Sequence, residues 1–343
     1  MGVLKNSLIA SVGLLFAGCY ENIDIPLESK PVLCLNSLIT AGEKIEVSVT
    51  HTWDYSQEVV FDDIKVDDAI VEIYANDCLC DSDYIAEEGD RIRIYVTSAK
   101  YGEASAEVTV PYAVDFNVSN LRLNVVDRWK LPESVGSQEG EMGECRYLMM
   151  NVSADVEITD DSSAINYFEF RPYSKNFIRD ILGIPDDDDN TTYYANSGYI
   201  GGDLQTDMEP IFHEHMDAFE SMIGSTPYGV GFFTDRQFDG GSYTLHIIYK
   251  DARYWIRMQE YAPELLNVGY VFRLYTVSES YYNWSVYRWY TVDSGMSDLV
   301  DIGLSDAIWG YSNVSTGAGV VAAIACRSHN VDLSDLLKDQ IDF

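Results

Sequence analysis

The stretch from residue 213 to residue 217 contains side chains that could bind a metal. Its sequence, His-Glu-His-Met-Asp, can be compared with His-Glu-x-x-His, in which two histidines one helical turn apart bind zinc and the glutamate activates water. The comparison fails at the fifth position, because Asp217 stands where the second histidine is needed. Glu209, His213 and Asp217 could still share one face of a helix as ligands, but no third-ligand partner is evident elsewhere. We therefore interpret His213 and His215 as core or capping residues and expect no metal site.

A run of four aspartates, Asp186-Asp187-Asp188-Asp189, could gather calcium, which prefers oxygen ligands on flexible loops. The run does not follow the helix-loop-helix calcium pattern. Thr191 replaces the required glycine, and Ser197 replaces the final glutamate. Blocks of like charge usually stay in water, so we prefer the interpretation of a solvated acidic loop.

The sequence contains none of the common patterns for catalysis or cofactor binding. There is no Gly-x-Ser-x-Gly elbow for a nucleophilic serine and no Gly-x-x-x-x-Gly-Lys loop for phosphate. The chain has 56 acidic residues, so some pair of carboxylates must lie at glycosidase distance by chance. We therefore predict no catalytic residue and no cofactor, and a hydrolase with an unrecognised site is only a third alternative.

The amino terminus has the order of features found in a bacterial export signal. Lys5 precedes an apolar run from Leu8 to Ala17, which is too short to span a bilayer as a permanent helix. The run ends in Phe-Ala-Gly-Cys, which resembles the lipobox of bacterial lipoproteins with Phe in place of the usual Leu. We predict that residues 1–18 are a cleaved signal peptide, that Cys19 carries lipid, and that residues 19–30 are a tether.

Lipid on Cys19 would hold the protein at a membrane, because each buried CH₂ group of an acyl chain contributes about 0.8 kcal/mol. The early acidic residues Glu21 and Asp24 resemble the export tags that send some Gram-negative lipoproteins to the outer face of the outer membrane. We therefore expect a lipid-anchored protein of the outer membrane that faces the cell surface or the periplasm.

The charge of the chain excludes nucleic acid as a partner. Removal of residues 1–18 takes away Lys5 and no acidic residue, so the formal net charge goes from −34 to −35. Binding to phosphate backbones needs clustered Lys and Arg. We interpret the acidic surface as a device for solubility.

With Cys19 lipidated, an odd number of cysteines remains, and an odd set cannot pair completely within one chain. Cys78 and Cys80 are too close to pair with each other, although either could pair with a distant partner. The pairing is therefore left open for Cys34, Cys78, Cys80, Cys145 and Cys326.

Between Val32 and Tyr112, apolar and polar residues alternate with a period of two, which indicates half-buried strands. Turn signals such as Ala41-Gly42-Glu43 separate these strands, and the spacing is typical of a small β-sandwich. We place this domain at residues 31–113. The clearest alternating segments are residues 44–50, 69–74, 91–96 and 103–110.

The remaining residues, 114–343, are predicted to form a larger β-rich domain. Its alternating segments are residues 116–126, 146–156, 166–173, 230–233, 242–249 and 268–274. Helices are expected near residues 207–223 and 276–292. The second of these begins with Thr276 and Glu279 as a capping-box pair and is aromatic nearly all round, so it should be buried on most sides. Shorter helices are expected at residues 176–182 and after Ser334.

Several segments of the chain together resemble one known family. They are residues 23–26 (Ile-Asp-Ile-Pro), 31–40 (Pro-Val-Leu-Cys-Leu-Asn-Ser-Leu-Ile-Thr), 101–106 (Tyr-Gly-Glu-Ala-Ser-Ala) ahead of Val110-Pro111, 233–240 (Phe-Thr-Asp-Arg-Gln-Phe-Asp-Gly), 280–282 (Ser-Tyr-Tyr) and 311–320 (Tyr-Ser-Asn-Val-Ser-Thr-Gly-Ala-Gly-Val). They resemble lipoproteins that carry domain of unknown function 4249, which are common in Gram-negative bacteria with TonB-dependent nutrient import.

The resemblance covers nearly all of the mature chain. It implies an immunoglobulin-like first domain, a larger β-rich second domain and a location in the cell envelope, but it implies no reaction. A departure lies between residues 76 and 84, where the family usually has a longer hairpin.

Two hypotheses about function follow. The first is a binding or accessory lipoprotein of nutrient uptake, which works beside a TonB-dependent transporter on a glycan, a peptide or another nutrient. The second is an adhesive or structural surface protein. Exposed aromatic groups on one loop-rich end would favour the first, and a flat apolar patch without a cleft would favour the second.

Overall fold

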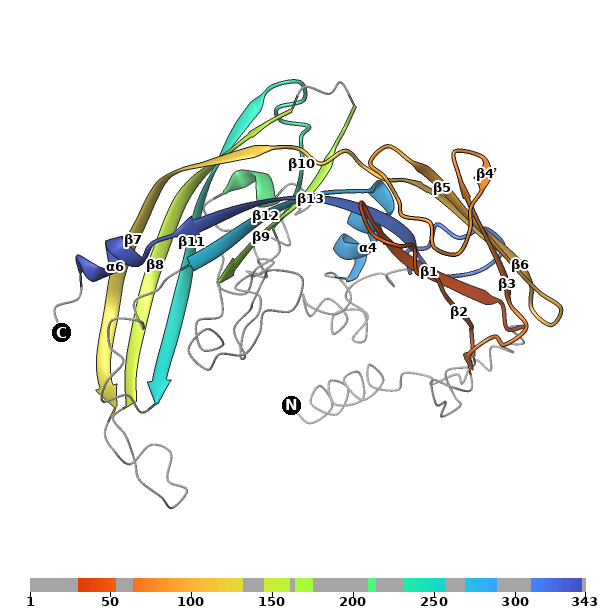
Figure 1. Ribbon diagram of the computed structural model, residues 1–343, viewed down its shortest axis with the longest axis horizontal. Helices are drawn as coiled ribbons and strands as arrows, with labels where there is room; N and C mark the ends of the chain where they lie inside the picture. The colour runs from red at the N-terminus through yellow and green to blue at the C-terminus, as the bar shows by residue number, and fades with distance from the viewer. Residues whose placement is uncertain are drawn as a thin grey trace, which may run out of the picture.

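The structure is a computed structural model that describes residues 30–53, 64–131, 145–160, 164–174, 209–213, 231–256, 269–288 and 310–340. Most of these residues lie in strands, which form one six-stranded sheet, one four-stranded sheet and one three-stranded sheet (Figure 1). The prediction of a mainly β fold is confirmed, and the paired layers resemble a β-sandwich. The immunoglobulin-like topology stays a prediction.

The six-stranded sheet runs through both halves of the molecule. Its strand order is β10-β9-β12-β13-β1-β2, with β1 and β13 parallel and the other neighbours antiparallel. The strands are β1 (Leu33–Thr40), β2 (Ser48–His51), β9 (Tyr167–Ser174), β10 (Phe232–Thr234), β12 (Gly269–Val277) and β13 (Val321–Asp332).

The four-stranded sheet has the order β4-β3-β5-β6 and covers the β1 end of the six-stranded sheet. Its strands are β3 (Ile70–Ala75), β4 (Cys78–Leu79), β5 (Arg91–Ser98) and β6 (Gly102–Thr109). Along β5 the side chains of Ile92, Ile94 and Val96 are fully buried, whereas those of Arg91 and Arg93 are exposed. This alternation is the pattern that the sequence predicted for a sheet with one buried face.

The three-stranded sheet has the order β11-β8-β7 and covers the other end of the six-stranded sheet. Its strands are long: β7 (Phe116–Leu131), β8 (Cys145–Thr159) and β11 (Ser242–Ile256). β7 is irregular between Ser119 and Arg122 and again between Val125 and Asp127, where its register against β8 shifts. Such irregularities bend a long strand and let it curve over a core.

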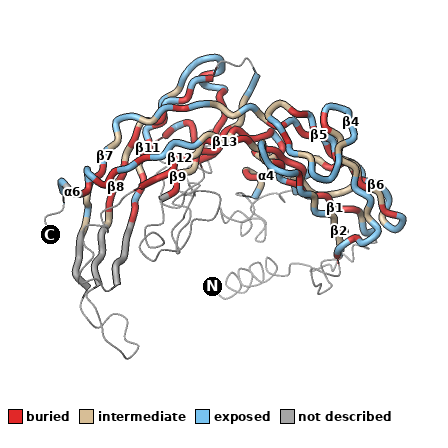
Figure 2. Tube along the Cα trace, in the orientation of Figure 1, coloured by how far each residue is buried: buried red, intermediate tan, exposed pale blue. Residues whose placement is uncertain are grey.

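Strand β13 enters both hydrophobic cores on one face of the six-stranded sheet. Val321 and Ala323 belong to the core beneath the four-stranded sheet, and Val331 belongs to the core beneath the three-stranded sheet. Ile324, which points to the opposite face, packs against the apolar cluster around Tyr282. Figure 2 shows the buried residues of β13 in the middle of the molecule, between the two groups of strands.

The N-terminal core is completed by residues from the C-terminal part of the chain. Val314, Val321 and Ala323 pack in one cluster with the strands of residues 33–110. The predicted boundary between residues 113 and 114 stays a prediction, but the two segments on either side of it share a core.

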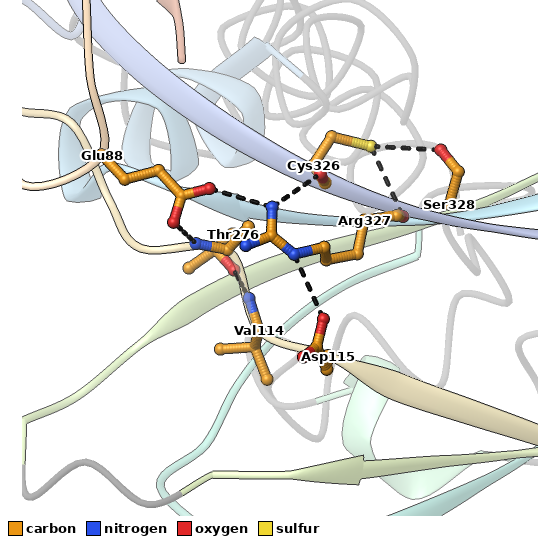
Figure 3. A network of polar contacts seen from close by, with 8 residues as sticks. Glu88, Val114, Asp115, Thr276, Cys326, Arg327 and Ser328 are labelled. Atoms are coloured by element: carbon orange, nitrogen blue, oxygen red, sulfur yellow. Dashed lines mark hydrogen bonds and ion pairs between the residues drawn. The ribbon is translucent and has the colours of Figure 1, made fainter. Parts of the chain in front are cut away.

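A polar junction joins the two halves near this boundary (Figure 3). Arg327 Nη1 donates a hydrogen bond to Glu88 Oε1 at 2.9 Å, and Arg327 Nε donates to Asp115 Oδ1 at 3.1 Å. The Val114 amide donates to Thr276 Oγ1 at 3.2 Å. The hydrogen bond to Glu88 is the main reason that the pKa of Arg327 is raised.

The helix expected at residues 276–292 is present as α4 (Glu279–Arg288), with residues 289–292 outside the described part. Its capping differs from the prediction. Thr276 belongs to β12, and the Tyr281 amide donates to Ser278 Oγ at 3.3 Å, so Ser278 is the capping residue. The helix after Ser334 is confirmed as α6 (Ser334–Lys338).

Of the helix expected at residues 207–223, the structure describes residues 209–213. Here Pro210–His213 form a 3-10 helix, η4, in place of the expected α-helix. Short 3-10 turns are common at the ends of helices, where the first amides lack partners. The rest of that segment and the helix expected at residues 176–182 lie outside the described residues. Within the described residues, no helix combines the length and the apolar character needed to cross a membrane.

Candidate functional site

The candidate site is an open groove between α4 and one face of the six-stranded sheet. Its volume is about 560 Å³. Pockets that bind small ligands commonly have volumes of about 300–1,000 Å³, so the groove falls within this range. It is lined by Asn36, Ser37, Leu38, Glu46, Val47, Ser48, Tyr281, Trp284, Val320 and Ala322.

The floor of the groove is the face of β1 that points away from the core. Because side chains alternate along a strand, Leu35 and Ile39 are buried in the core, while Asn36 and Leu38 face outward. Leu38 is 50% exposed. Asn36 pairs with Ser48 across the β1–β2 ladder, so an amide and a hydroxyl lie side by side on this floor.

The wall of the groove is one face of α4. Tyr281 and Trp284 are three residues apart on the helix and therefore lie on the same side of it. Their ring centroids are 6.3 Å apart. Tyr282, the residue after Tyr281, faces the sheet and packs on Phe232 and Val277. This contact holds the helix in place. The helix thus presents two aromatic rings to the groove while its other side is buried.

A buried ion pair fixes the position of Tyr281. Arg171 donates to Glu169 Oε1 through Nε at 2.6 Å and Nη2 at 2.5 Å. Tyr281 Oη donates to Glu169 Oε2 at 3.1 Å and accepts from Arg171 Nη2 at 3.1 Å. Glu169 and Arg171 are two residues apart on β9, so they share the face of the sheet that α4 covers. The hydroxyl of Tyr281 is therefore held by both members of the pair.

Burial shifts the titration of this network. Glu169 is 3% exposed, and the loss of water raises its pKa, against the lowering influence of Arg171. Burial is also the first cause of the raised pKa of Tyr281, followed by the negative charge of Glu169. Tyr281 is therefore protonated at neutral pH and can donate its hydrogen bond.

Aromatic rings and guanidinium groups continue this network along β9 and β12. The guanidinium of Arg171 lies 5.4 Å from the ring centroid of Tyr275, and that of Arg273 lies 5.5 Å from that of Tyr173. Arg273 Nη1 also donates to Tyr275 Oη at 3.2 Å. These contacts make the surface behind the groove wall a packed layer of polar aromatics.

The lining of the groove favours binding over catalysis. Among the described residues it contains aromatic, aliphatic, amide and hydroxyl groups, with Glu46 as the only acidic side chain and no Lys, Arg, His or Cys. The arrangement can stack the flat face of a ligand on the two rings and form hydrogen bonds at the floor.

The structure describes one of the three residues weighed as metal ligands. Glu209 is 2% exposed and accepts hydrogen bonds from Tyr243 Oη at 3.0 Å and from the His246 amide at 2.5 Å, so it anchors η4 to β11. The side chains of His213 and Asp217 lie outside the described residues, as do Cys19 and the acidic run Asp186-Asp187-Asp188-Asp189.

Four cysteines have described side chains, and all four are free thiols: Cys34, Cys78, Cys80 and Cys326. The side chain of Cys145 is outside the described part. Among the described cysteines no disulfide is formed, so neither Cys78 nor Cys80 pairs with one of these distant partners.

The groove and its ion pair were missed in the sequence. Residues 168–171 read Phe-Glu-Phe-Arg, so two opposite charges alternate with two aromatic residues on β9. Two opposite charges on the same face of such a strand could have indicated an ion pair. The partner that completes the signal, Tyr281, lies in one of the segments that carry the family resemblance.

Comparison with known proteins gives one match. The model of the family described as Domain of unknown function (DUF4249) matches residues 20–328, which is most of the chain. No curated protein and no solved structure matches the chain. The chain therefore belongs to the DUF4249 family.

Proposed function

We propose that the protein is a lipid-anchored binding protein of the outer membrane that holds a neutral oligosaccharide in its groove as an accessory to nutrient uptake. The observation that carries this proposal is the pair of rings, Tyr281 and Trp284, on one wall of an open groove of about 560 Å³. The groove is hollowed, which favours a bound ligand over the flat contact surface of an adhesive protein.

The chemistry of the lining supports a sugar as the ligand. One face of a pyranose ring is a set of C–H groups that packs on an aromatic ring, and its edge carries hydroxyl groups. Trp284 and Tyr281 offer the rings, while Asn36 and Ser48 offer hydrogen-bonding groups on the facing floor. Glu46 adds a further acceptor for hydroxyl groups.

The charge of the protein argues for a neutral ligand. The lining residues that the structure describes include no cationic side chain to hold a phosphate, sulfate or carboxylate group, and the formal net charge of the chain is −34. An anionic polymer would be repelled by this field. Nucleic acid remains excluded as a partner for the same reason.

The proposed membrane location depends on Cys19, which follows an apolar run of export-signal length. A lipid at Cys19 and a tether of residues 19–30 would place the folded part close to a membrane. From there the protein would deliver its ligand to a TonB-dependent transporter, which we propose as its partner.

The lipid is tested by mass analysis of the native protein and of a Cys19→Ser variant. We expect the native chain to begin at Cys19 with acyl chains attached, and to sediment with membranes. The variant should keep its leader or be released as a soluble form, because no thiol is available for acylation. An intact leader or an unmodified thiol on the native chain would contradict this part of the proposal.

The ligand is tested by calorimetric titration with neutral oligosaccharides and, in parallel, with apolar peptides. We expect a Trp284→Ala variant to bind the sugar about five- to twelvefold more weakly, because removal of a stacked aromatic ring costs roughly 1–1.5 kcal/mol. The matched control is Trp53→Ala, which removes a tryptophan that is 50% exposed and lies outside the groove.

Equal affinity in the Trp284→Ala and wild-type proteins would show that the groove is not the binding site. Binding of peptides in place of sugars, with the same loss in Trp284→Ala, would keep the site and replace the ligand class.

A further inference from the structure

Three carboxylates that do not line the groove gather at the ends of strands, and we call Asp160, Asp235 and Asp239 the carboxylate cluster. One carboxylate oxygen of each lies within 4.8 Å of those of the other two. Asp160 directly follows β8, and Asp235 directly follows β10. Asp239 lies in the turn that leads into β11. The cluster therefore joins the ends of strands from two different sheets.

Backbone hydrogen bonds hold these chain segments together. The Asp160 amide donates to the Gly241 carbonyl at 2.8 Å, and the Asp235 amide donates to the Asn166 carbonyl at 3.2 Å. Within the turn, the Phe238 amide donates to the Asp235 carbonyl at 2.7 Å. The positions of the carboxylates are thus fixed by the fold and do not depend on long, flexible side chains.

Hydrogen bonds to Asp160 use both of its carboxylate oxygens. Oδ1 accepts from Asn166 Nδ2 at 3.0 Å, and Oδ2 accepts from the Gly240 amide at 3.0 Å. Asp235 Oδ2 accepts from the Asn166 amide at 2.8 Å. Asn166 therefore forms hydrogen bonds with two members of the carboxylate cluster at once and holds their carboxylates close together.

One oxygen of the cluster is left without a donor. Asp235 is 0% exposed, and its Oδ1 is buried and accepts no hydrogen bond. A buried carboxylate oxygen without a partner is costly, and natural structures seldom keep one without a reason. Burial raises the pKa of Asp235, and the negative charges of Asp160 and Asp239 raise it further. A cation bound at Asp235 would compensate both the buried, unpaired oxygen and the neighbouring negative charges.

We propose that the carboxylate cluster is a calcium site. The donor atoms are all oxygens, which suit a hard cation, and no His or Cys belongs to the group. Calcium–oxygen distances are about 2.4 Å, so two ligands on opposite sides of a Ca²⁺ ion lie about 4.8 Å apart. The mutual distances of the three carboxylate oxygens fit within that limit.

The exposure of the three residues indicates how an ion would reach the carboxylate cluster. Asp160 and Asp235 are 2% and 0% exposed, whereas Asp239 is exposed, so an ion can reach the cluster from the side of Asp239. Bound there, Ca²⁺ would fasten the turn of residues 235–241 to the end of β8. The site is therefore structural, and it is independent of the groove.

The test is thermal unfolding and calorimetric titration of the purified protein in detergent, after treatment with a chelator. We expect one Ca²⁺ per chain at this site, with a dissociation constant on the order of 10⁻⁴ M, as in extracellular calcium modules. At about 10 mM Ca²⁺, roughly 100 times that constant, the unfolding temperature should rise by several degrees. Mg²⁺ should act more weakly, because it demands a tighter octahedral geometry.

The variants are chosen to keep the fold. Asp239→Asn removes one charge at an exposed position, and it should weaken calcium binding tenfold or more while leaving the chelated protein at least as stable. Asp235→Asn should abolish the response.

Two controls separate this site from other carboxylates. Asp67→Asn removes an exposed charge in another part of the fold, and Asp187→Asn removes one from the acidic run; both should keep the full calcium response. The proposal is overturned if Ca²⁺ leaves the unfolding temperature unchanged, or if Asp239→Asn and Asp235→Asn respond like the wild type. A loss confined to Asp187→Asn, or an equal response to Mg²⁺, also overturns it.

Discussion

Replacement of Gly319 by alanine should lower the free energy of unfolding by about 3 kcal/mol, the sum of backbone strain and overpacking. Gly319 has a φ of +107°, a conformation that residues with a side chain rarely adopt. A Cβ atom there would lie 2.2 Å from the Leu35 carbonyl oxygen and 2.8 Å from its carbonyl carbon. These are backbone atoms of β1, so they cannot move aside without breaking the contact between β1 and residues 318–320.

The contact is close because the two backbones are hydrogen-bonded. The Leu35 amide donates to the Ala318 carbonyl at 2.8 Å, and the Ala318 amide donates to the Leu33 carbonyl at 2.9 Å. Gly319 therefore sits where two strands meet without room for a side chain. This explains why the segment of residues 311–320, one of those with the family resemblance, is rich in small residues.

The matched control is Gly102→Ala. Gly102 also has a positive φ, of +85°, but a Cβ atom there meets nothing within 4 Å. Only the conformational strain remains, so we expect a loss of about 1–2 kcal/mol. Urea unfolding followed by circular dichroism measures both values. Similar losses in the two variants would show that the close approach of residues 318–320 to β1 is not maintained in solution.

A second large effect is expected for Arg171→Met, which should lower the free energy of unfolding by about 3–5 kcal/mol at neutral pH. The variant keeps most of the side-chain volume but leaves Glu169 buried without its cation. The loss should shrink as the pH falls from neutral toward the ordinary titration range of glutamate, because Glu169, whose pKa is already raised by burial, then folds in its neutral form. Unfolding measured across a pH series checks this direction.

Two variants test the origin of that loss. Arg91→Met breaks an ion pair with Asp77 at the surface, where both side chains are about half exposed or more, and it should cost roughly 1 kcal/mol or less. The double variant Glu169→Gln/Arg171→Met removes both charges, so it should recover a large part of the stability. Equal costs for Arg171→Met and Arg91→Met would contradict the importance of burial. Arg171→Met should also lower the affinity for sugar, because Arg171 forms a hydrogen bond with Tyr281, whereas Arg91→Met should leave that affinity unchanged.

The strands could be predicted from the sequence where one face of the sheet is buried and the other is exposed to solvent. The alternation at residues 91–96 became β5, that at residues 166–173 became β9, and that at residues 242–249 became the first half of β11. In β5 and β11 the apolar residues are the buried ones, whereas β9 also buries Glu169 on the face that α4 covers. Period-two alternation is a local property, so one sequence is enough to read it.

Strand β13 was not predicted, and its surroundings explain why. Its first half, Val-Ala-Ala-Ile-Ala, lies between a core on one face and α4 on the other, so apolar residues occur on both sides and alternation disappears. Its parallel pairing with β1 joins segments that are distant in the sequence, such as Ser37 with Val321. No local pattern carries that information.

The sites were harder to predict than the fold for the same reason. The groove brings Asn36, Trp284 and Val320 together from three distant segments. In the carboxylate cluster, Asp235 and Asp239 are close in the sequence, but Asp160 joins them only through the fold. With 56 acidic residues in the chain, proximity could not be inferred from composition.

The place of β13 in both cores has a consequence for how the protein is made. When β6 has left the ribosome, Val314, Val321 and Ala323 are not yet synthesised, so the nascent chain lacks part of the core that β1 to β6 need. Until those residues are available, the apolar side chains of the early strands stay exposed, and chaperones can bind them. Once the late segment arrives, it closes both cores, so the two halves should fold as one slow, cooperative event rather than one after the other.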